Sequence, residues 1–199
     1  MSEGQVILST AYLPPIEYFA FINESEVFFL EGAEHYQKQS YRNRANIMTG
    51  NGVQSLIIPV VHQSSKMMIR DVRIDYKNDW QRQHWKTIES AYNNSPFFLY
   101  FQDYLFPFYQ KKYPFLFDYN LEIISILLKL LRIKKDPVIT ASFEMNVSIK
   151  DLRNEIHPKR EIIKPRKAYS QVFEDKYSFV PNLSVIDYLF NLGTSEKFY

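Results

Sequence analysis

A histidine lies between two tryptophans in the segment KNDWQRQHWKTIESAY, residues 77–92. Imidazole titrates near neutral pH, so His84 is a candidate general acid or base. If the segment is a helix with about 100° per residue, His84 faces inward on the same arc as Trp80 and Trp85. The opposite face then carries Arg82, Lys86, Glu89 and Ser90.

Two interpretations of His84 are open. A buried polar group without a hydrogen-bond partner costs roughly 1–3 kcal/mol, so a core histidine would bond to a backbone carbonyl. Alternatively, His84 acts as the base of a pocket whose wall includes Trp85. No second histidine or carboxylate lies at metal-ligand spacing on this helix, and we predict no zinc site.

The second candidate for chemistry is the basic segment EGAEHYQKQSYRNRANI, residues 31–47. Guanidinium and ammonium groups in one loop can hold a phosphate or a carboxylate. The segment follows a predicted strand, and α/β sheets place binding loops after strands. The alternative to a binding loop is a charged run that is simply exposed to solvent. Glu31 and Glu34 lie here too, but two glutamates without a phosphate loop predict no metal site. The predicted ligand-binding residues are His35, Lys38, Arg42, Asn43 and Arg44.

The elements that must position these residues begin with a strand, a loop, a helix and a strand. Residues 6–9 are a short apolar run, residues 16–22 have helical apolar spacing, and residues 26–30 return to a strand pattern. The loop after the first strand lies at the carboxyl edge of such a sheet, where ligands bind. It contains Tyr12 and Pro14, which either line a pocket or form a rigid turn.

Antiparallel hairpins are expected next. The sequence GNG at 50–52 separates NIM from VQSLIIPVV and is typical of a tight turn, because glycine and asparagine tolerate positive φ. A second turn at HQSSK, residues 62–66, leads into MMIRDVRID, residues 67–75. These strands are expected to pair antiparallel.

Helices dominate the rest of the chain. Asn78 and Gln81 resemble a capping box in front of the histidine helix. Further helices are predicted at 97–109, with a break at Pro107, at 115–133, and at 183–191, where Ser184 is the start signal and Gly193 the stop signal. A strand is predicted at 138–142, and a charged loop excursion at 149–167. We therefore predict an α/β fold over residues 1–199 as a single domain. Its mixed sheet, with a β-α-β start and antiparallel hairpins, packs with several helices.

The composition excludes several function classes. The net charge of +2 predicts no nucleic-acid partner, and the absence of cysteine excludes disulfides and thiolate zinc sites. The most apolar window, residues 121–131, carries Glu122 and Lys129 and is too short to span a bilayer. With no signal-peptide pattern at the start, we expect a cytoplasmic protein without membrane insertion. The 17% of aromatic residues suit a thick core or an aromatic pocket.

Six segments, in order, resemble the WbqC-like family: AYLPPIEYF, YQKQSYRNRANI, LIIPV, DVRID, WQRQHWKTIESAYNNSPFF and FVPNLSVIDYLFNLG. They span nearly the whole chain. Carried over residue by residue, the family pattern covers Tyr12, Pro14, Tyr18, Phe19, Lys38, Asn43, Arg44, Trp80, His84, Trp85, Ala91 and Tyr92. The sequence departs at Glu17, where many members have glycine, and lacks the glutamine-proline start often seen before the tyrosine.

This family occurs in bacterial gene clusters for O-antigen and other surface polysaccharides. The resemblance implies a cytoplasmic transferase, acting by amino-acyl (glycyl) transfer to the amino group of a nucleotide-linked sugar. His84 would then be the base, and Lys38, Arg42 and Arg44 would hold the anion. The alternatives are a non-catalytic module that binds a nucleotide-sugar or a partner enzyme, and a structural protein. The expected ligand is a small molecule, such as a nucleotide-sugar or an amino acid. The cofactor, including magnesium with ATP, and the oligomeric state are left open.

Overall fold

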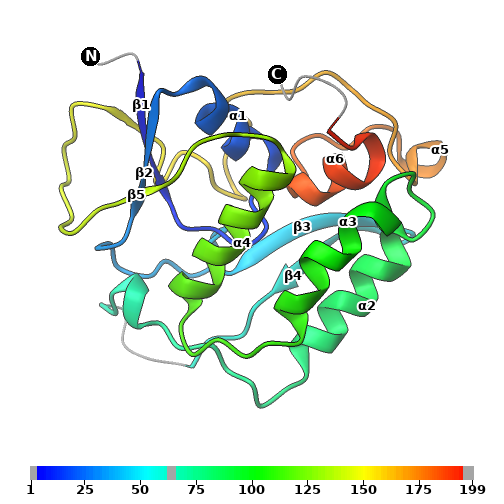
Figure 1. Cartoon of the computed structure of the whole chain (residues 1–199), viewed down its shortest axis with the longest axis horizontal. Helices are drawn as coiled ribbons and strands as arrows, with labels where there is room; N and C mark the ends of the chain where they lie inside the picture. Colours follow the sequence, from blue (N-terminus) through cyan, green and yellow to red (C-terminus); the bar gives the residue numbers. More distant parts are fainter. Residues whose placement is uncertain (1–3, 62–65, 195–199) are drawn as a thin grey trace.

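A parallel sheet holds the start of the chain, at one end of the molecule (Figure 1). The computed structural model describes residues 4–61 and 66–194. The sheet has four strands in the order β5-β2-β1-β6, and every pair is parallel. The strands are β1 (Gln5–Ser9), β2 (Val27–Glu31), β5 (Val138–Ile139) and β6 (Lys150–Asp151).

The β-α-β start is confirmed. β1 and β2 pair in register from Gln5↔Val27 to Ser9↔Glu31, and helix α1 (Ile16–Glu24) makes the crossover between them. All of α1 from Ile16 to Ile22 is buried, as is most of β1, because both belong to the core. This explains why β1 is a continuous apolar run without alternation.

The hairpin at GNG is also confirmed. β3 (Arg44–Thr49) and β4 (Gly52–Ile57) pair antiparallel, with Thr49 opposite Gly52. Gly52 has φ +97, in the left-handed region that favours glycine. The turn therefore depends on the glycine that predicted it.

The prediction of a strand at 67–75 is wrong. This segment contains the 3-10 helix η1 (Ile69–Asp71) and makes the isolated bridges His35↔Met68, Val60↔Ile74 and Arg73↔Phe115 instead of a strand. Ile69 is fully buried and breaks the polar-apolar alternation of a half-exposed strand. The turn predicted before it falls mostly on residues 62–65, which lie outside the described part of the chain.

The predicted helices form. Pro107 does end one of them early, because the chain tightens into a 3-10 turn at Phe106. The elements are α2 (Trp80–Tyr92), α3 (Phe98–Leu105), η2 (Phe106–Tyr109), α4 (Leu116–Leu130), α6 (Val185–Leu192) and the unpredicted α5 (Glu174–Tyr177).

The prediction of a capping box before α2 is wrong. The helix begins after Asp79, and no side chain caps it. Gln81 Nε2 instead donates to the carbonyls of Phe108 and Lys111, at 2.9 and 2.8 Å. Its side chain is therefore used to tie η2 and the following turn to α2.

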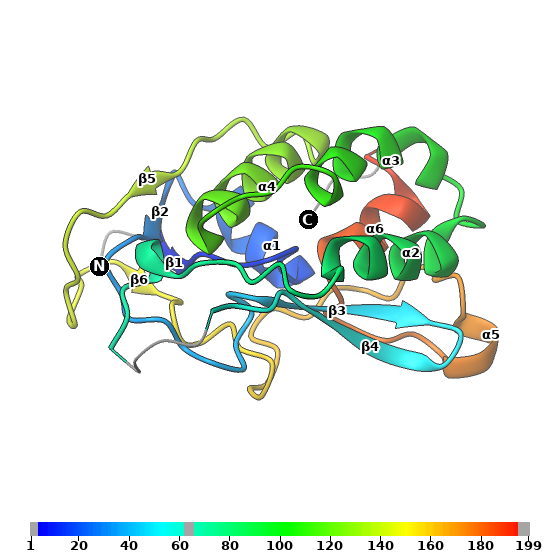
Figure 2. The same ribbon diagram turned by 90° about the horizontal axis from the view of Figure 1, so that it is seen from below.

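The helices α2, α3, α4 and α6 lie on one side of the β3-β4 hairpin (Figure 2). Aromatic side chains fill much of the space between the elements, including the fully buried Tyr12, Tyr92, Tyr119, Tyr188, Phe19 and Phe190. The described residues form one α/β domain with a parallel sheet and an antiparallel hairpin, which confirms the predicted fold class. No helix within residues 4–61 and 66–194 has the length and apolarity to cross a membrane.

One predicted loop contains a strand. β6 lies within residues 149–167 and pairs with β1 at Val6↔Lys150 and Ile7↔Asp151. Both strand residues are exposed, so the pattern of buried residues that identifies a strand is absent. β6 gives β1 a second neighbour, and β1 becomes an inner strand of the sheet.

Candidate functional site

The carboxyl ends of the parallel strands bring polar residues together. Ser9 ends β1, Glu31 ends β2, Asp151 ends β6, and Thr140 follows β5. In open α/β sheets, ligands bind at this edge, where chain connections leave a strand in opposite directions. Because β1 lies between β2 and β6, the region beyond Ser9 is the natural place for a site.

The first ion pair at this edge joins Arg42 to Glu34. Arg42 Nε and Nη2 donate to the two carboxylate oxygens at 2.8 and 2.5 Å, and both side chains are buried. Ser9 Oγ lies 2.6 Å from Arg42 Nη2 and 3.1 Å from Glu34 Oε2. This bidentate arrangement fixes the plane of the guanidinium group and leaves Nη1 outside the pair.

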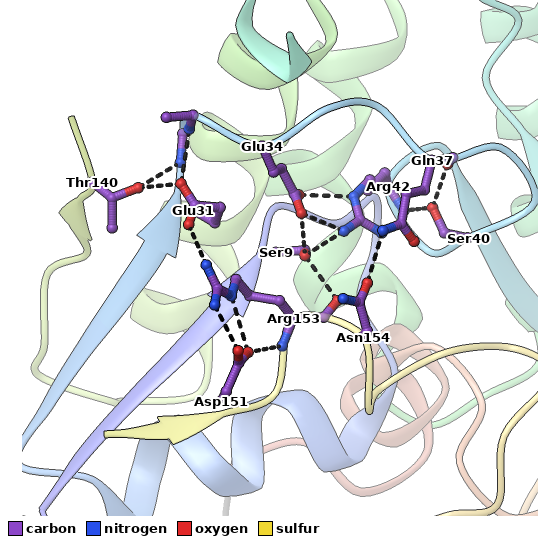
Figure 3. Close-up of polar contacts among 12 residues, drawn as sticks. Ser9, Glu31, Glu34, Gln37, Ser40, Arg42, Thr140, Asp151, Arg153 and Asn154 are labelled. Carbon is purple, nitrogen blue, oxygen red and sulfur yellow. Dashed lines mark hydrogen bonds and ion pairs between the residues drawn. The ribbon is translucent and has the colours of Figure 1, made fainter. Parts of the chain in front are cut away.

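The second ion pair network is centred on Arg153. Its Nη1 donates to Glu31 at 2.8 Å, and its Nε and Nη2 donate to Asp151 at 3.0 and 2.6 Å. Although burial raises the pKa of Asp151, the bonds from Arg153 outweigh it and hold that pKa below its usual value. Arg153 thus links the ends of β2 and β6, with Ser9 of β1 between the two arginines (Figure 3).

A small pocket opens beside these ion pairs, with room for about one water molecule. It is lined by Ser9, Thr10, Ala11, Tyr18, Tyr41, Arg42, Leu152, Arg153 and Ile156. Thr10 is 1% exposed, and its hydroxyl has no hydrogen-bond partner among the described residues. Buried polar atoms are nearly always paired, so an unpaired hydroxyl at a pocket wall marks a place for a ligand or a water.

Two distant segments that contribute residues to this pocket are tied to each other close to it. Gln37 donates to Asn154 at 2.9 Å, and Lys159 Nζ donates to Gln39 at 2.6 Å, so residues 37–39 are tied to residues 154–159. Tyr36, Arg44 and His157 are half-buried and are not among the residues that line the pocket. Burial lowers the pKa of His157, and the positive charges of Arg42, Lys159, Arg160 and Arg44 lower it further.

The basic loop separates into residues with different environments. Arg42 lines the pocket, whereas His35 and Lys38 are exposed. Asn43 is buried and donates from Nδ2 to the Ile58 carbonyl at 2.8 Å, so its side chain forms a structural hydrogen bond with the backbone. Arg44 opens β3 and is half-buried.

The first loop is buried throughout. Tyr12 donates its backbone N–H to the Tyr41 carbonyl at 2.9 Å, and the Pro14 carbonyl accepts from Val185 at 2.9 Å. The Tyr12 hydroxyl lies 3.0 Å from His84 Nδ1 and 2.9 Å from the Tyr109 hydroxyl. The loop therefore joins the sheet edge to the helices through the Tyr12 side chain.

His84 faces inward on α2, as its position on the helix predicts, and is 7% exposed. Its ring packs against Trp80, with 5.1 Å between centroids, and it hydrogen-bonds to Tyr12 and to the Ile57 backbone. Burial lowers its pKa to about 4, so the imidazole is neutral at pH 7. We call Tyr12, His84, Tyr109, Trp80 and Tyr119 the aromatic network.

Trp85 lies outside that network. It is half-buried and packs on Phe106 and Tyr109, with ring centroids 4.9 and 5.5 Å away. Neither Trp85 nor His84 is among the residues that line the carboxyl-edge pocket. The roles predicted for these two residues stay predictions.

Glu17, the position at which the sequence departs from the family pattern, fixes a loop through hydrogen bonds to its carboxylate. It is 2% exposed, and its carboxylate accepts from the backbone N–H groups of Ile163 and Lys164 and from Asn182 Nδ2. Burial raises its pKa despite these bonds. Where glycine offers no side chain, this chain uses a glutamate to fix residues 163–164.

Several residues at this edge were not predicted as site residues, namely Ser9, Thr10, Tyr18, Tyr41, Thr140, Asp151 and Arg153. Ser9 and Thr10 had a usable signal, because they directly follow a predicted strand. Arg153 had none, because the strand before it is two exposed residues long. Glu31 and Glu34 pair with arginines, and the described residues contain no group of three or more His, Cys, Asp or Glu suited to a metal ion.

Comparison with known proteins agrees with the segments of the sequence that resemble a known family. The uncharacterized protein Rv1507c of Mycobacterium tuberculosis is 33% identical over 104 residues, which cover 52% of this chain and 45% of the relative. The match thus spans about half the length of that relative. No solved structure matches the chain significantly. The model of the WbqC-like protein family matches residues 10–161, more than half of the chain, and the chain therefore belongs to this family.

Proposed function

We propose that the protein binds an anionic small molecule at the carboxyl edge of the sheet, with one polar atom of the ligand in the pocket, and uses it in the biosynthesis of bacterial surface polysaccharide. The observation that carries the binding proposal is the unpaired Thr10 hydroxyl, buried in the wall of a pocket that Arg42 also lines. A hydroxyl can donate to an anion, and Arg42 Nη1 lies outside the pair with Glu34. The pathway is implied by membership of the family.

The proposed reaction is amino-acyl transfer to a sugar amine. The amine nitrogen attacks the acyl carbon of an activated amino acid, the amide bond forms, the bond to the leaving group breaks, and a base takes a proton from nitrogen. His84 is the proposed base, because its imidazole is neutral at pH 7, although burial lowers its pKa to about 4 and thereby weakens it as a base. Lys38, Arg42 and Arg44 are proposed to hold the anionic part of the donor or of the nucleotide.

The alternative is a non-catalytic protein that binds a nucleotide-sugar or a partner of the same pathway. One observation favours it: His84 is held inside the aromatic network, whereas the pocket walls carry ion pairs and hydroxyls. A binding protein needs the pocket but no titrating group in it. The two functions share the binding step and differ in turnover.

The binding step is tested by thermal unfolding with inorganic phosphate, nucleotide-sugars, amino acids and ATP. A ligand at a hundredfold excess over its Kd stabilises the folded protein by roughly 2.7 kcal/mol, which shifts the transition measurably. Thr10→Val keeps the shape of the side chain and should abolish the shift. Thr87→Val is the matched control, because that hydroxyl only donates to the Gln83 carbonyl within α2. A shift that survives in Thr10→Val contradicts the proposed pocket.

The transfer step is tested by mass spectrometry of mixtures of an amino sugar nucleotide and an activated amino acid. The transferase predicts an amide product from the natural protein and its loss in His84→Gln, with ligand binding retained. Binding without product in the natural protein supports the alternative. Product formation at the natural rate by His84→Gln would exclude His84 as the base.

A further inference from the structure

We infer that strand β5 is the contact surface for a second copy of this chain, and that the two β5 strands pair antiparallel across a twofold axis at Ile139. The inference goes beyond the proposed function, because it concerns how two chains associate and not what the carboxyl edge binds. The pairing joins two four-stranded sheets into one continuous sheet.

The outer edge of β5 is apolar and exposed. The strand order β5-β2-β1-β6 gives β5 one neighbour, β2, and Figure 2 shows β5 at the margin of the sheet. Val138 is 45% exposed and Ile139 is 37% exposed. An edge strand presents a row of backbone N–H and C=O groups to solvent, and an apolar edge is a template for pairing with another strand.

The opposite edge of the same sheet is protected. β6 consists of Lys150 and Asp151, both exposed, and charged side chains on an edge oppose pairing with another chain. The exposed strand of the hairpin, β4, carries the polar Gln54 and Ser55 in its middle. β5 has no charged or polar residue between its ends. This contrast singles out β5 as the edge suited to pairing.

The backbone of β5 is self-complementary about Ile139. The Thr140 N–H donates to the Leu30 carbonyl at 3.0 Å, so the backbone groups of Thr140 face β2. Successive residues of a strand direct these groups to opposite edges, and those of Ile139 therefore face away from β2. In an antiparallel pair, two residues directly opposite each other exchange both N–H···O bonds. Ile139 and its counterpart in a second copy meet this condition for each other.

The length of β5 favours a second copy over an unstructured peptide. β5 is two residues long and offers few backbone hydrogen bonds to a partner. A flexible peptide would lose the conformational entropy of every residue that it orders, and so few bonds do not offset that loss. A second copy presents a strand that β2 already orders, and a twofold contact uses the same surface on both chains.

The charges that flank β5 also suit an antiparallel pair. Before the strand, Arg132 and Lys134 are exposed together with Asp136, so this flank has a surplus of positive charge. After the strand, Glu144 is exposed. Antiparallel pairing brings the flank before the strand of each copy towards the flank after the strand of the other. Opposite charges therefore approach each other twice, once on each side of the axis.

The test is sedimentation velocity of the full chain at concentrations from about 1 to 300 μM, which bracket a Kd on the order of 10 μM for a small interface. The natural chain should form a dimer whose fraction rises with concentration. Ile139→Pro removes the outward N–H and keeps the bonds to β2, because an edge strand tolerates proline where its N–H faces solvent. This variant should be monomeric. Val53→Lys changes an exposed valine of β4 and should dimerise like the natural chain.

A charge exchange tests the direction of pairing. Lys134→Glu should raise the dimer Kd about threefold or more, because it replaces two attractions with two repulsions. Adding Glu144→Lys restores opposite charges across the axis and should restore the Kd. A double variant that stays as weak as Lys134→Glu contradicts the antiparallel arrangement.

Each variant is first checked for folding by circular dichroism. If Ile139→Pro fails to fold, Ile139→Lys replaces it, because a charged side chain on the exposed edge opposes pairing without altering the bonds to β2. A natural chain that is monomeric at every concentration overturns the inference. So does a dimer that persists in the folded Ile139 variant. A dimer that is lost in Val53→Lys and kept in the Ile139 variant assigns the contact to the hairpin and overturns it as well.

Discussion

Two buried polar clusters meet at the first loop, and they differ in kind. The aromatic network is built from hydroxyls and a neutral imidazole, whereas the Arg42–Glu34 pair is built from full charges. Both regions contain unpaired buried atoms, namely Trp80 Nε1 and Tyr119 Oη in the first and Thr10 Oγ1 in the second. Of these residues, Thr10 lines a pocket among those described. An unpaired polar atom therefore indicates a site only when it has space beside it.

The largest effect should come from breaking the ion pair. Glu34→Gln leaves the Arg42 charge buried with its main partner removed, and we expect it to lower the free energy of unfolding by about 3–5 kcal/mol. Chemical denaturation measures this loss. The double variant Glu34→Gln with Arg42→Met removes both charges and should recover part of the stability. A loss below about 1 kcal/mol would mean that the pair is solvated.

The stability that the aromatic network contributes should depend on pH. The pKa of His84 is about 4 in the folded protein and 6.5 in its unfolded reference, so the unfolded chain binds more protons between these values. Stability should therefore fall as pH drops from about 6.5 to about 4, by about 3 kcal/mol from this residue. The measurement is urea unfolding at pH 7 and pH 4. His84→Gln is the reference, and an equal pH dependence in both proteins would contradict the buried neutral state.

The smallest effects compare two hydroxyls on the same loop. Tyr12→Phe deprives His84 and Tyr109 of a buried partner and should cost about 1–2 kcal/mol of stability. Thr10→Val removes an unpaired hydroxyl and should leave stability unchanged or raise it by up to about 1 kcal/mol. Both values come from unfolding without ligand. A large loss in Thr10→Val would show that its hydroxyl has a structural partner.

The sequence contained enough to predict the first half of the sheet, the hairpin and the buried face of α2. These features rest on local signals: an apolar run, a GNG turn and helical spacing. The strand at 67–75 and the capping box failed because Ile69 and Gln81 are used by tertiary contacts rather than by their own element. The pattern of residue types along a segment does not show such tertiary contacts.

The candidate site was predictable only in part. The basic loop and the carboxyl edge were expected, and Arg42 does line the pocket there. However, a sequence shows the same charges whether an arginine is free or paired, and the pairing of Arg42 with Glu34 depends on three-dimensional placement. Arg153 follows directly after β6, whose two exposed residues have no periodicity to detect.

The position of β6 also bears on when the site can form. Ser9 and Arg153 touch across a separation of 144 positions, so their contact closes a very long loop. Contacts of such long range form slowly, because the chain must lose loop entropy before the contact stabilises it. The pocket wall at residues 152–156 therefore becomes complete late in folding. During synthesis, a nascent chain that already has its first strands and hairpin would still lack this wall, and binding of the proposed ligand would report that β6 has paired with β1.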